Sequence, residues 1–176
     1  MIYEPAEDSF LLAEQIKFFA KNKKILDMGT GSGILAQEAK KSGAKEVLAA
    51  DINKESKDFL KNKKIKFIHS NLFSNTKGKF DLIIFNPPYL PLDKREDVKS
   101  SLITAGGRKG DEIIIEFLKQ SKKHLNKKGI ILIVLSSLTP KKRINQLIRK
   151  NTMAKKVLAK KSFFMETLEV WKIFNK

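Results

Sequence analysis

The 176-residue sequence contains no cysteine and only two histidines. The missing cysteines exclude a disulfide framework and a thiolate metal site within the chain. Neither histidine stands near a second metal-binding side chain in the sequence, so no metal site is predicted. The longest aliphatic run, Ile130 to Leu135, has six residues, whereas a membrane-spanning helix needs about 20. Because the start, MIYEPAEDSF, is acidic rather than basic, no signal peptide is expected and the cytoplasm is the predicted location.

Arginine is scarce as well. The chain has 36 basic and 19 acidic residues, a net charge of +17, yet only four of the basic residues are arginine. One interpretation is an acidic partner such as RNA or a ribosome-bound factor. The other is a solvated, lysine-rich surface that reflects the composition of the proteome, because nucleic-acid contacts favour the arginine fork. The sequence leaves both open.

Short apolar runs alternate with amphipathic stretches, which predicts an α/β fold: a mostly parallel sheet with helices on both faces. The predicted strands are Lys24–Met28, Glu46–Ala50, Ile65–His69, Phe80–Phe85 and Gly129–Leu135. The predicted helices are Ser9–Ala20 (with Ser9 as N-cap), Ser32–Ser42, Lys54–Lys61, Gly110–Asn126 and Pro140–Lys150. Val157–Phe164 and Thr167–Phe174 are β-rich and only two residues apart, which predicts a closing antiparallel hairpin. No repeat or linker divides the chain, so residues 1–176 are expected to form one domain.

A glycine-rich loop, LDMGTGSGILA, follows the first predicted strand. Gly29, Gly31 and Gly33 allow a tight turn and a close approach to a ligand. The dinucleotide fingerprint G-x-G-x-x-G is not met, because Ile34 stands in place of its last glycine. The carboxylate of Asp27 suits a ligand with an ammonium group, such as the methionine part of S-adenosylmethionine, better than a pyrophosphate. A tight turn without a ligand is the alternative.

Polar residues also follow the next two predicted strands. Asp51 can accept hydrogen bonds from both hydroxyls of a ribose, or it can cap the helix that follows. Asn71 and Leu72 can address the edge and the face of an adenine. Because ligands of open parallel sheets bind beyond the carboxyl ends of the strands, these side chains are expected to converge there.

The fourth predicted strand ends in FNPPYLP, a stiff corner that lacks backbone donors. Such a corner can hold a planar group with N–H donors in one orientation, because its acceptors are fixed in place. Asn86 offers a side-chain oxygen, the Pro87 carbonyl is a second acceptor, and the ring of Tyr89 can stack on a planar amide. Alignment of this kind can account for roughly 7–11 kcal/mol of an activation barrier.

The segment from Pro87 to Lys109 has no clear periodicity. Loops of this length are uncommon in compact domains unless they serve a function. It ends in AGGRKG, where Gly106 and Gly107 can supply backbone angles that are closed to other residues. We expect it to fold over a bound substrate; a disordered surface insertion is the alternative.

These motifs resemble those of class I S-adenosylmethionine-dependent methyltransferases. More narrowly, the ordered set YEPAEDS, LDMGTGSG, NPPY and AGGRKG resembles the HemK-like release-factor glutamine methyltransferases, and in particular their short archaeal and eukaryotic branch. The similarity spans nearly the whole chain. It implies a Rossmann-like, seven-stranded, mostly parallel sheet whose last strand is antiparallel. It also implies a cytoplasmic enzyme that methylates the glutamine of the Gly-Gly-Gln loop of the class-1 translation release factor.

The resemblance implies roles for individual residues. Asp27 would meet the amino acid part of S-adenosylmethionine, Asp51 the ribose, and Asn71 with Leu72 the adenine. The cofactor-binding residues it implies are Glu7, Asp8, Ser9, Asp27, Gly29, Gly31, Gly33, Asp51, Ile52, Asn71, Leu72 and Asn86, and the catalytic residues are Asn86, Pro87 and Tyr89. A small zinc-ribbon activator protein would pair along Ile65–His69.

NPPY is shared with enzymes that methylate amino groups of adenine and guanine. N-methylation of RNA or DNA therefore stays an alternative, and the net charge of +17 keeps it open. A module that binds the cofactor without catalysis is a third interpretation, which the intact acceptor motif disfavours.

Overall fold

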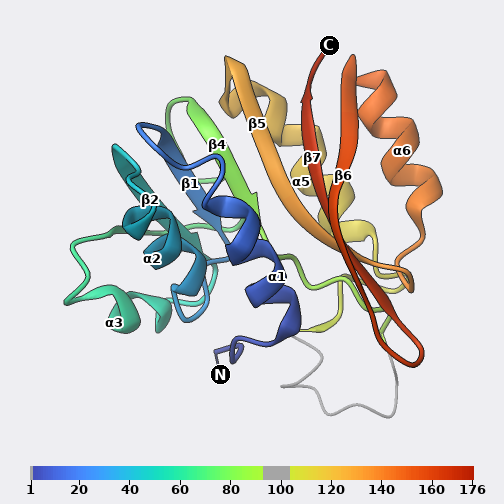
Figure 1. Cartoon of the computed structure of the whole chain (residues 1–176), viewed down its shortest axis with the longest axis horizontal. Helices are drawn as coiled ribbons and strands as arrows, with labels where there is room; N and C mark the ends of the chain where they lie inside the picture. Colours follow the sequence, from blue (N-terminus) through green and yellow to red (C-terminus); the bar gives the residue numbers. More distant parts are fainter. Residues whose placement is uncertain (1, 93–103) are drawn as a thin grey trace.

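A computed structural model describes residues 2–92 and 104–176. Figure 1 shows strands and helices alternating along most of the described chain, with a hairpin at its end. The strands are β1 (Lys24–Met28), β2 (Glu46–Asp51), β3 (Lys66–His69), β4 (Phe80–Phe85), β5 (Leu125–Ser136), β6 (Met153–Ser162) and β7 (Thr167–Asn175). The helices are α1 (Glu7–Ile16), α2 (Ile34–Lys41), α3 (Ser56–Leu60), α5 (Glu112–Ser121), the 3₁₀ turn η1 (Lys122–His124) and α6 (Lys141–Lys150).

The seven strands form one sheet in the order β3-β2-β1-β4-β5-β7-β6. The pairs from β3 to β5 are parallel, whereas β7 runs antiparallel to both of its neighbours. Seven strands, a mostly parallel sheet and an antiparallel last strand confirm the predicted fold class. The strand order reverses at β1 and β4, so a crevice opens beyond the carboxyl ends of these two strands.

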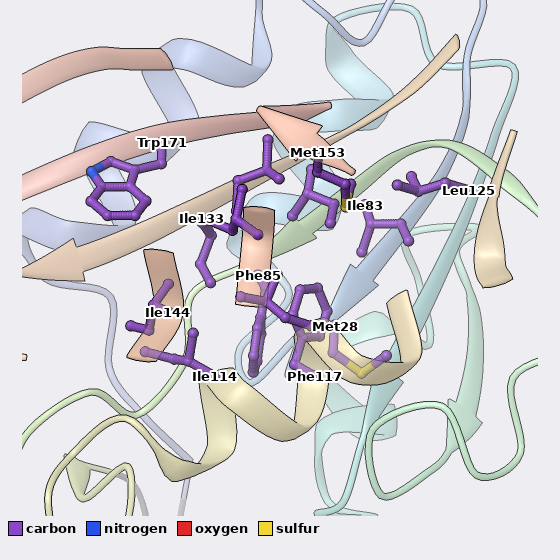
Figure 2. Close-up of a cluster of buried hydrophobic side chains, with 14 of the residues drawn as sticks. Met28, Ile83, Phe85, Ile114, Phe117, Leu125, Ile133, Ile144, Met153 and Trp171 are labelled. Atoms are coloured by element: carbon purple, nitrogen blue, oxygen red, sulfur yellow. The ribbon is translucent and has the colours of Figure 1, made fainter. Parts of the chain in front are cut away.

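Two apolar cores flank the sheet, because side chains alternate between its faces along each strand. One core contains Met28, Ile83 and Phe85 from the strands and packs against α5 and α6, which contribute Phe117 and Ile144 (Figure 2). The other contains the alternate residues of the same strands and packs against α1 and α2. The predicted helices on both faces are therefore confirmed.

Several predicted boundaries are wrong. Helix α1 begins at Glu7 with Ala6 as N-cap, so Ser9 lies inside the helix and is not its cap. The predicted helix Gly110–Asn126 ends at Ser121, and β5 already begins at Leu125, where it pairs with Phe80. The first hairpin strand begins at Met153, four residues before the prediction. No helix in the described ranges has the length and apolar character that crossing a membrane requires.

Candidate functional site

A cleft of about 1450 Å³ lies beyond the carboxyl ends of the parallel strands. Most of the site residues expected from the sequence line it, although they come from five separate segments. Those that line the cleft are Asp8, Ser9, Gly29, Gly31, Asp51, Ile52, Asn71, Leu72, Asn86, Pro87 and Tyr89. The topology thus brings together residues that are up to 81 positions apart in the sequence.

Three residues expected at the site lie elsewhere. Glu7 does not line the cleft and forms an ion pair with Lys161 of β6. Asp27 is fully buried beneath the glycine loop. Gly33 is in the left-handed region (φ 79°), and a β-carbon there would lie 2.4 Å from Leu60, so α3 packs against it. Gly33 therefore shapes the loop from behind and does not line the cleft.

The buried Asp27 is held by the residues that follow it. Its Oδ2 accepts hydrogen bonds from Thr30 Oγ1 (2.6 Å) and from the amide of Ala36 (3.0 Å). Its Oδ1 has no partner among the described residues. Burial raises the pKa of Asp27 to about 7, even though these two hydrogen bonds act in the opposite direction. A cation near Oδ1 would stabilise the charged form.

Asp51 connects the ends of β1 and β2. One carboxylate oxygen accepts a hydrogen bond from the amide of Gly31 (2.7 Å) and the other from the amide of Asn53 (2.7 Å). The carboxylate therefore holds the glycine loop in place while it lines the cleft. Each oxygen keeps further acceptor capacity for the hydroxyls of a ligand.

The wall beyond Asp51 is suited to a flat apolar group. The side chain of Ile52 is 65% exposed although it is aliphatic, and it lines the cleft. Leu72 has a positive φ of 46° and packs partly against the core. Ser70 Oγ stabilises this turn by donating to the carbonyl of Leu72 (2.6 Å). Asn71 lies beside it with an exposed side chain, so its amide is accessible to a ligand.

Asp8 is the centre of a hydrogen-bond network at the other end of the cleft. Its carboxylate accepts hydrogen bonds from the phenols of Tyr3 (2.9 Å) and Tyr89 (3.1 Å) and from the amide and hydroxyl of Ser9. Asp8 is buried, so this many donors offset the cost of removing its charge from water. The network fixes the ring of Tyr89 relative to α1.

The same network reaches Asn86 through Ser9. Asn86 Nδ2 donates to Ser9 Oγ (3.3 Å). This orientation leaves Asn86 Oδ1 buried and without a hydrogen-bond partner in the described part of the chain. A buried acceptor of this kind costs about 1–3 kcal/mol until a donor reaches it. Asn86 is thus a preoriented acceptor at the wall of the cleft.

Both phenols of the network are donors at any physiological pH. Burial raises the pKa of Tyr89 far above its ordinary value of 10.0, and the charge of Asp8 adds to the rise. Burial and the same carboxylate raise the pKa of Tyr3. A protonated, neutral phenol ring at Tyr89 can face a developing positive charge without changing its own charge.

The segment AGGRKG supports the NPPY corner from outside. The amide of Gly106 donates to the carbonyl of Leu90 (2.9 Å), and Thr139 Oγ1 donates to the carbonyl of Tyr89 (3.0 Å). A β-carbon at Gly106 would lie 2.5 Å from the carbonyl oxygen of Pro88, so no other residue fits there. Tyr3 and Thr139 were not expected at the site. Residues 93–103 of the predicted Pro87–Lys109 segment lie outside the described residues.

The cleft is acidic although the chain is strongly basic. Among the described residues that line it, five carry a carboxylate and two carry a positive charge. The carboxylates belong to Asp8, Asp51, Glu55, Glu112 and Glu116, and the cations are Lys54 and Arg108. The excess positive charge of the protein therefore lies elsewhere on its surface.

Comparison with known proteins agrees with this geometry. A family model described as the methyltransferase small domain matches residues 7–165. A relative from Methanocaldococcus jannaschii, provisionally named a protein N5-glutamine methyltransferase, is 43% identical over 83% of this chain and 78% of its own length. The release factor glutamine methyltransferase of Borreliella burgdorferi is 34% identical over 73% of this chain and 48% of its own length. The chain thus spans about half of that bacterial protein.

Among solved structures, the E. cuniculi Mtq2–Trm112 complex, responsible for methylation of the eRF1 termination factor, superposes with a TM-score of 0.81. The identity is 21%, and the match covers 99% of both chains, so this likeness shows the fold. The family model covers most of the chain, and the archaeal relative is similar over most of its length. The chain therefore belongs to the methyltransferase small domain family and, within it, to the HemK-like methyltransferases.

Proposed function

We propose that this protein transfers the methyl group of S-adenosylmethionine to the side-chain nitrogen of a glutamine, and that the substrate is the Gly-Gly-Gln loop of the class-1 translation release factor. The observation that carries the proposal is the unpartnered amide oxygen of Asn86 at the wall of the cleft. It is the acceptor that a planar N–H donor requires, and its orientation is set before any substrate arrives.

The cleft fits S-adenosylmethionine. Its volume exceeds the roughly 300–1,000 Å³ of common ligand pockets, so a glutamine side chain can enter beside the cofactor. The Asp51 carboxylate suits the ribose hydroxyls, and the exposed aliphatic Ile52 suits the adenine. The unpartnered Oδ1 of the buried Asp27 suits a nearby ammonium group. When bound, the cofactor supplies an electrophilic methyl group on a positively charged sulfur.

The protein's own residues then orient the amide. Asn86 Oδ1 would accept one N–H of the glutamine, and the carbonyl at Pro87 would accept the other. Tyr89, held by Asp8, would stack on the amide plane. As the new carbon–nitrogen bond forms and the carbon–sulfur bond breaks, the nitrogen becomes positive. The ring face of Tyr89 and the carboxylate of Asp8 stabilise that charge, and the proton leaves afterwards to solvent.

The charge of the cleft favours a protein substrate over a nucleic acid. A nucleotide brings its phosphates to the rim of the site, where phosphate-binding proteins place lysine and arginine. Among the described residues that line this cleft, most of the charged side chains are carboxylates. A glycine-flanked glutamine carries no phosphate, and a loop can extend it without unstacking a base. The cytoplasm, where release factors act, is the location that this proposal implies.

The proposal is tested by mass spectrometry of the recombinant cognate release factor after incubation with the enzyme and cofactor. We expect one added methyl group on the glutamine of the Gly-Gly-Gln loop. A release factor with alanine in place of that glutamine is the matched control and should gain none. Transfer to purified RNA or DNA, with no methyl on the release factor, would reject the protein substrate.

We further propose that an activator protein covers β3. This strand lies at one edge of the sheet, and its outer side pairs with no other described strand. Phe67 and Ile68 are only partly buried there, and Phe59 of the neighbouring α3 is 48% exposed. An added strand from a partner would satisfy the open backbone groups and cover these side chains. The zinc-ribbon class of partner rests on the resemblance of the sequence.

The alternative is that Lys66 protects β3 from pairing, since a charged residue on an edge strand discourages the addition of another strand. Lys66 forms an ion pair with Glu46 at 3.4 Å. Co-expression with the zinc-ribbon protein distinguishes a strand that pairs with a partner from a strand that is protected by its lysine. The amide of Ser70 donates to Asp51 of β2, so the amides alternate along β3 and that of Phe67 faces the open side. We expect a stable complex, and replacement of Phe67 by proline should abolish it by removing an outward-facing backbone donor. Equal solubility and equal transfer rates with and without the second protein would count against a partner on β3.

A further inference from the structure

Twelve of the 32 lysines of this protein lie at the end of the sheet opposite the cleft. This edge consists of the amino ends of the parallel strands, and the C terminus lies there too (Figure 1). Twelve lysines belong to the segments 21–24, 45–46, 77–81, 122–128, 150–152 and 175–176, which we call the amino-edge surface. They are Lys21, Lys23, Lys24, Lys45, Lys77, Lys79, Lys122, Lys123, Lys127, Lys128, Lys150 and Lys176.

Hydrogen bonds join these segments into one continuous surface. The amide of Lys45 donates to the carbonyl of Lys23 (2.9 Å), which connects the amino ends of β1 and β2. The carboxylate of Asp81 accepts from the amide of Lys24 (2.9 Å) and from Asn126 Nδ2 (2.7 Å), which connects β1, β4 and β5. Lys122 Nζ donates to the carbonyl of Asn151 (2.5 Å), which connects the segment after α5 with the segment after α6.

Few carboxylates compensate the charge of this surface. The acidic side chains in its segments are those of Glu46 and Asp81. Asp81 is occupied by the backbone and by Asn126, and Glu46 lies within 4.0 Å of Lys24 and Lys66. Burial acts to raise the pKa of Asp81, but the hydrogen bonds from Lys24 and Asn126, with a smaller contribution from the charges of Lys23 and Lys45, lower it below its ordinary value. The edge therefore carries a strong positive potential, whereas the cleft at the other edge is acidic.

A small cavity of about 290 Å³ opens beside this surface. Lys21, Lys23, Lys128 and Lys172 line it together with two aromatic rings. Of these rings, Phe18 is 77% exposed. An exposed ring beside several lysines can stack on a base while the lysines contact the neighbouring phosphates.

We propose that the amino-edge surface binds RNA through its phosphate backbone, with Phe18 as a stacking site for an unpaired base. The lysines extend across the six strands from β2 to β6, a width of about 24 Å given strand spacings of about 4.8 Å. The lysines that line the small cavity can hold one phosphate, whereas the lysines of the other segments form a broad array that matches a polymer with regularly spaced phosphates. RNA bound at this edge leaves the cleft open, so one protein can hold an RNA-containing particle and methylate a second molecule.

The experiment measures binding of a fluorescent RNA hairpin by anisotropy over a series of salt concentrations. We expect binding that weakens steeply with salt. Combined Lys23→Glu, Lys79→Glu and Lys128→Glu should weaken it roughly tenfold or more and lower the salt slope by about 2 to 3. Phe18→Ala should weaken binding to RNA with unpaired bases while leaving the salt slope unchanged.

The matched control carries the same charge change away from this edge, as Lys57→Glu, Lys142→Glu and Lys160→Glu. These three lysines are exposed. We expect the control to bind RNA within about threefold of the wild-type protein. Glutamine at Lys23, Lys79 and Lys128 repeats the test if the acidic residues disturb folding, which circular dichroism detects.

Equal losses in both triple variants, or vesicles rich in phosphatidylserine that bind more tightly than RNA, would overturn the proposal. The inference does not depend on the methylation substrate. Methyl transfer to the release factor, measured without RNA, should be the same in the wild-type protein and in both variants. A failure of RNA binding is therefore distinguishable from a failure of the proposed methylation.

Discussion

The phenol of Tyr89 donates a hydrogen bond to Asp8 over 3.1 Å, although 81 residues separate them in the sequence. Tyr89 belongs to the NPPY corner and Asp8 to helix α1, so this bond joins the two motifs that frame one end of the cleft. Asp8 therefore acts on the acceptor motif, whereas the sequence resemblance implies a role in binding the cofactor.

Replacement of Asp8 by asparagine distinguishes these two roles. We expect methyl transfer to fall roughly 10- to 100-fold, because Tyr89 loses a charged acceptor and the site loses a carboxylate that stabilises the developing cation. Cofactor affinity, measured by calorimetric titration, should change less than about threefold. Tyr3→Phe is the control, since it removes a neighbouring donor to the same carboxylate. A large loss of cofactor affinity in Asp8→Asn would favour the role at the cofactor.

Asn86→Ala tests the acceptor directly. We expect a loss of roughly 100-fold or more in the transfer rate with cofactor binding preserved, by analogy with the removal of one preorganised polar contact. Ser9→Ala should have a smaller effect, because it removes only the group that orients Asn86. Single-turnover kinetics with saturating cofactor separate the chemical step from binding. A variant with alanine at position 86 and an unchanged rate is incompatible with the proposed mechanism.

Asp51→Ala should affect both ligand binding and the empty protein. Removal of the carboxylate deletes hydrogen bonds to a ribose, which corresponds to about 1–3 kcal/mol of cofactor affinity. It also leaves the amides of Gly31 and Asn53 without their acceptor, so the melting temperature of the cofactor-free protein should fall. Calorimetric titration and thermal unfolding measure the two effects. An unchanged affinity would reject the ribose assignment.

Gly106→Ala should disturb the backbone of the NPPY corner, which Gly106 contacts. The added methyl group would lie 2.5 Å from the carbonyl oxygens of Pro88 and Gly110, so the backbone has to move. We expect a loss of about 1–3 kcal/mol in the free energy of unfolding and a slower methyl transfer. Gly78→Ala is the control: it adds backbone strain at φ 87°, but its nearest contact is 3.8 Å away, at the amino edge. The control should transfer methyl groups normally.

The raised pKa of Asp27 gives a pH dependence with a defined sign. Its folded-state pKa of about 7 lies above the model-peptide value of 3.8, so its contribution to stability is complete below about pH 4. That contribution is lost as the pH rises through about 7, because the buried group must then ionise. Denaturant unfolding should show this decline in the wild-type protein but not in Asp27→Asn.

Cofactor affinity over the same pH range shows whether Asp27 also serves the ligand. If its Oδ1 meets an ammonium group, wild-type affinity should rise between pH 6 and pH 8, and Asp27→Asn should lack the rise. Identical profiles for the two proteins would assign Asp27 to the structure of the glycine loop alone.

The sequence by itself determined most of the helices and strands, and the end of the sheet at which the residues of the cleft gather. Runs such as Phe80–Phe85 and the glycine loop after Met28 depend on interactions between residues a few positions apart, which periodicity records. The sequence pattern predicted the wrong strand boundaries where lysines interrupt the alternation of apolar residues. The first hairpin strand begins at Met153, but its lysines point to solvent from an edge strand and hide the early residues. The start of β5 at Leu125 is concealed in the same way by Lys127 and Lys128.

Only the tertiary structure decided which residues of the different motifs contact one another. Glu7, Asp8 and Ser9 are adjacent in the sequence, yet one faces solvent and two contact Asn86 or Tyr89. The same holds for charge, since a count of +17 does not reveal an acidic cleft at one edge of the sheet and a lysine-rich surface at the other. Both depend on the order of the strands, which is set by the packing of the whole sheet and its helices. Such contacts between distant residues leave no periodic trace in a single sequence.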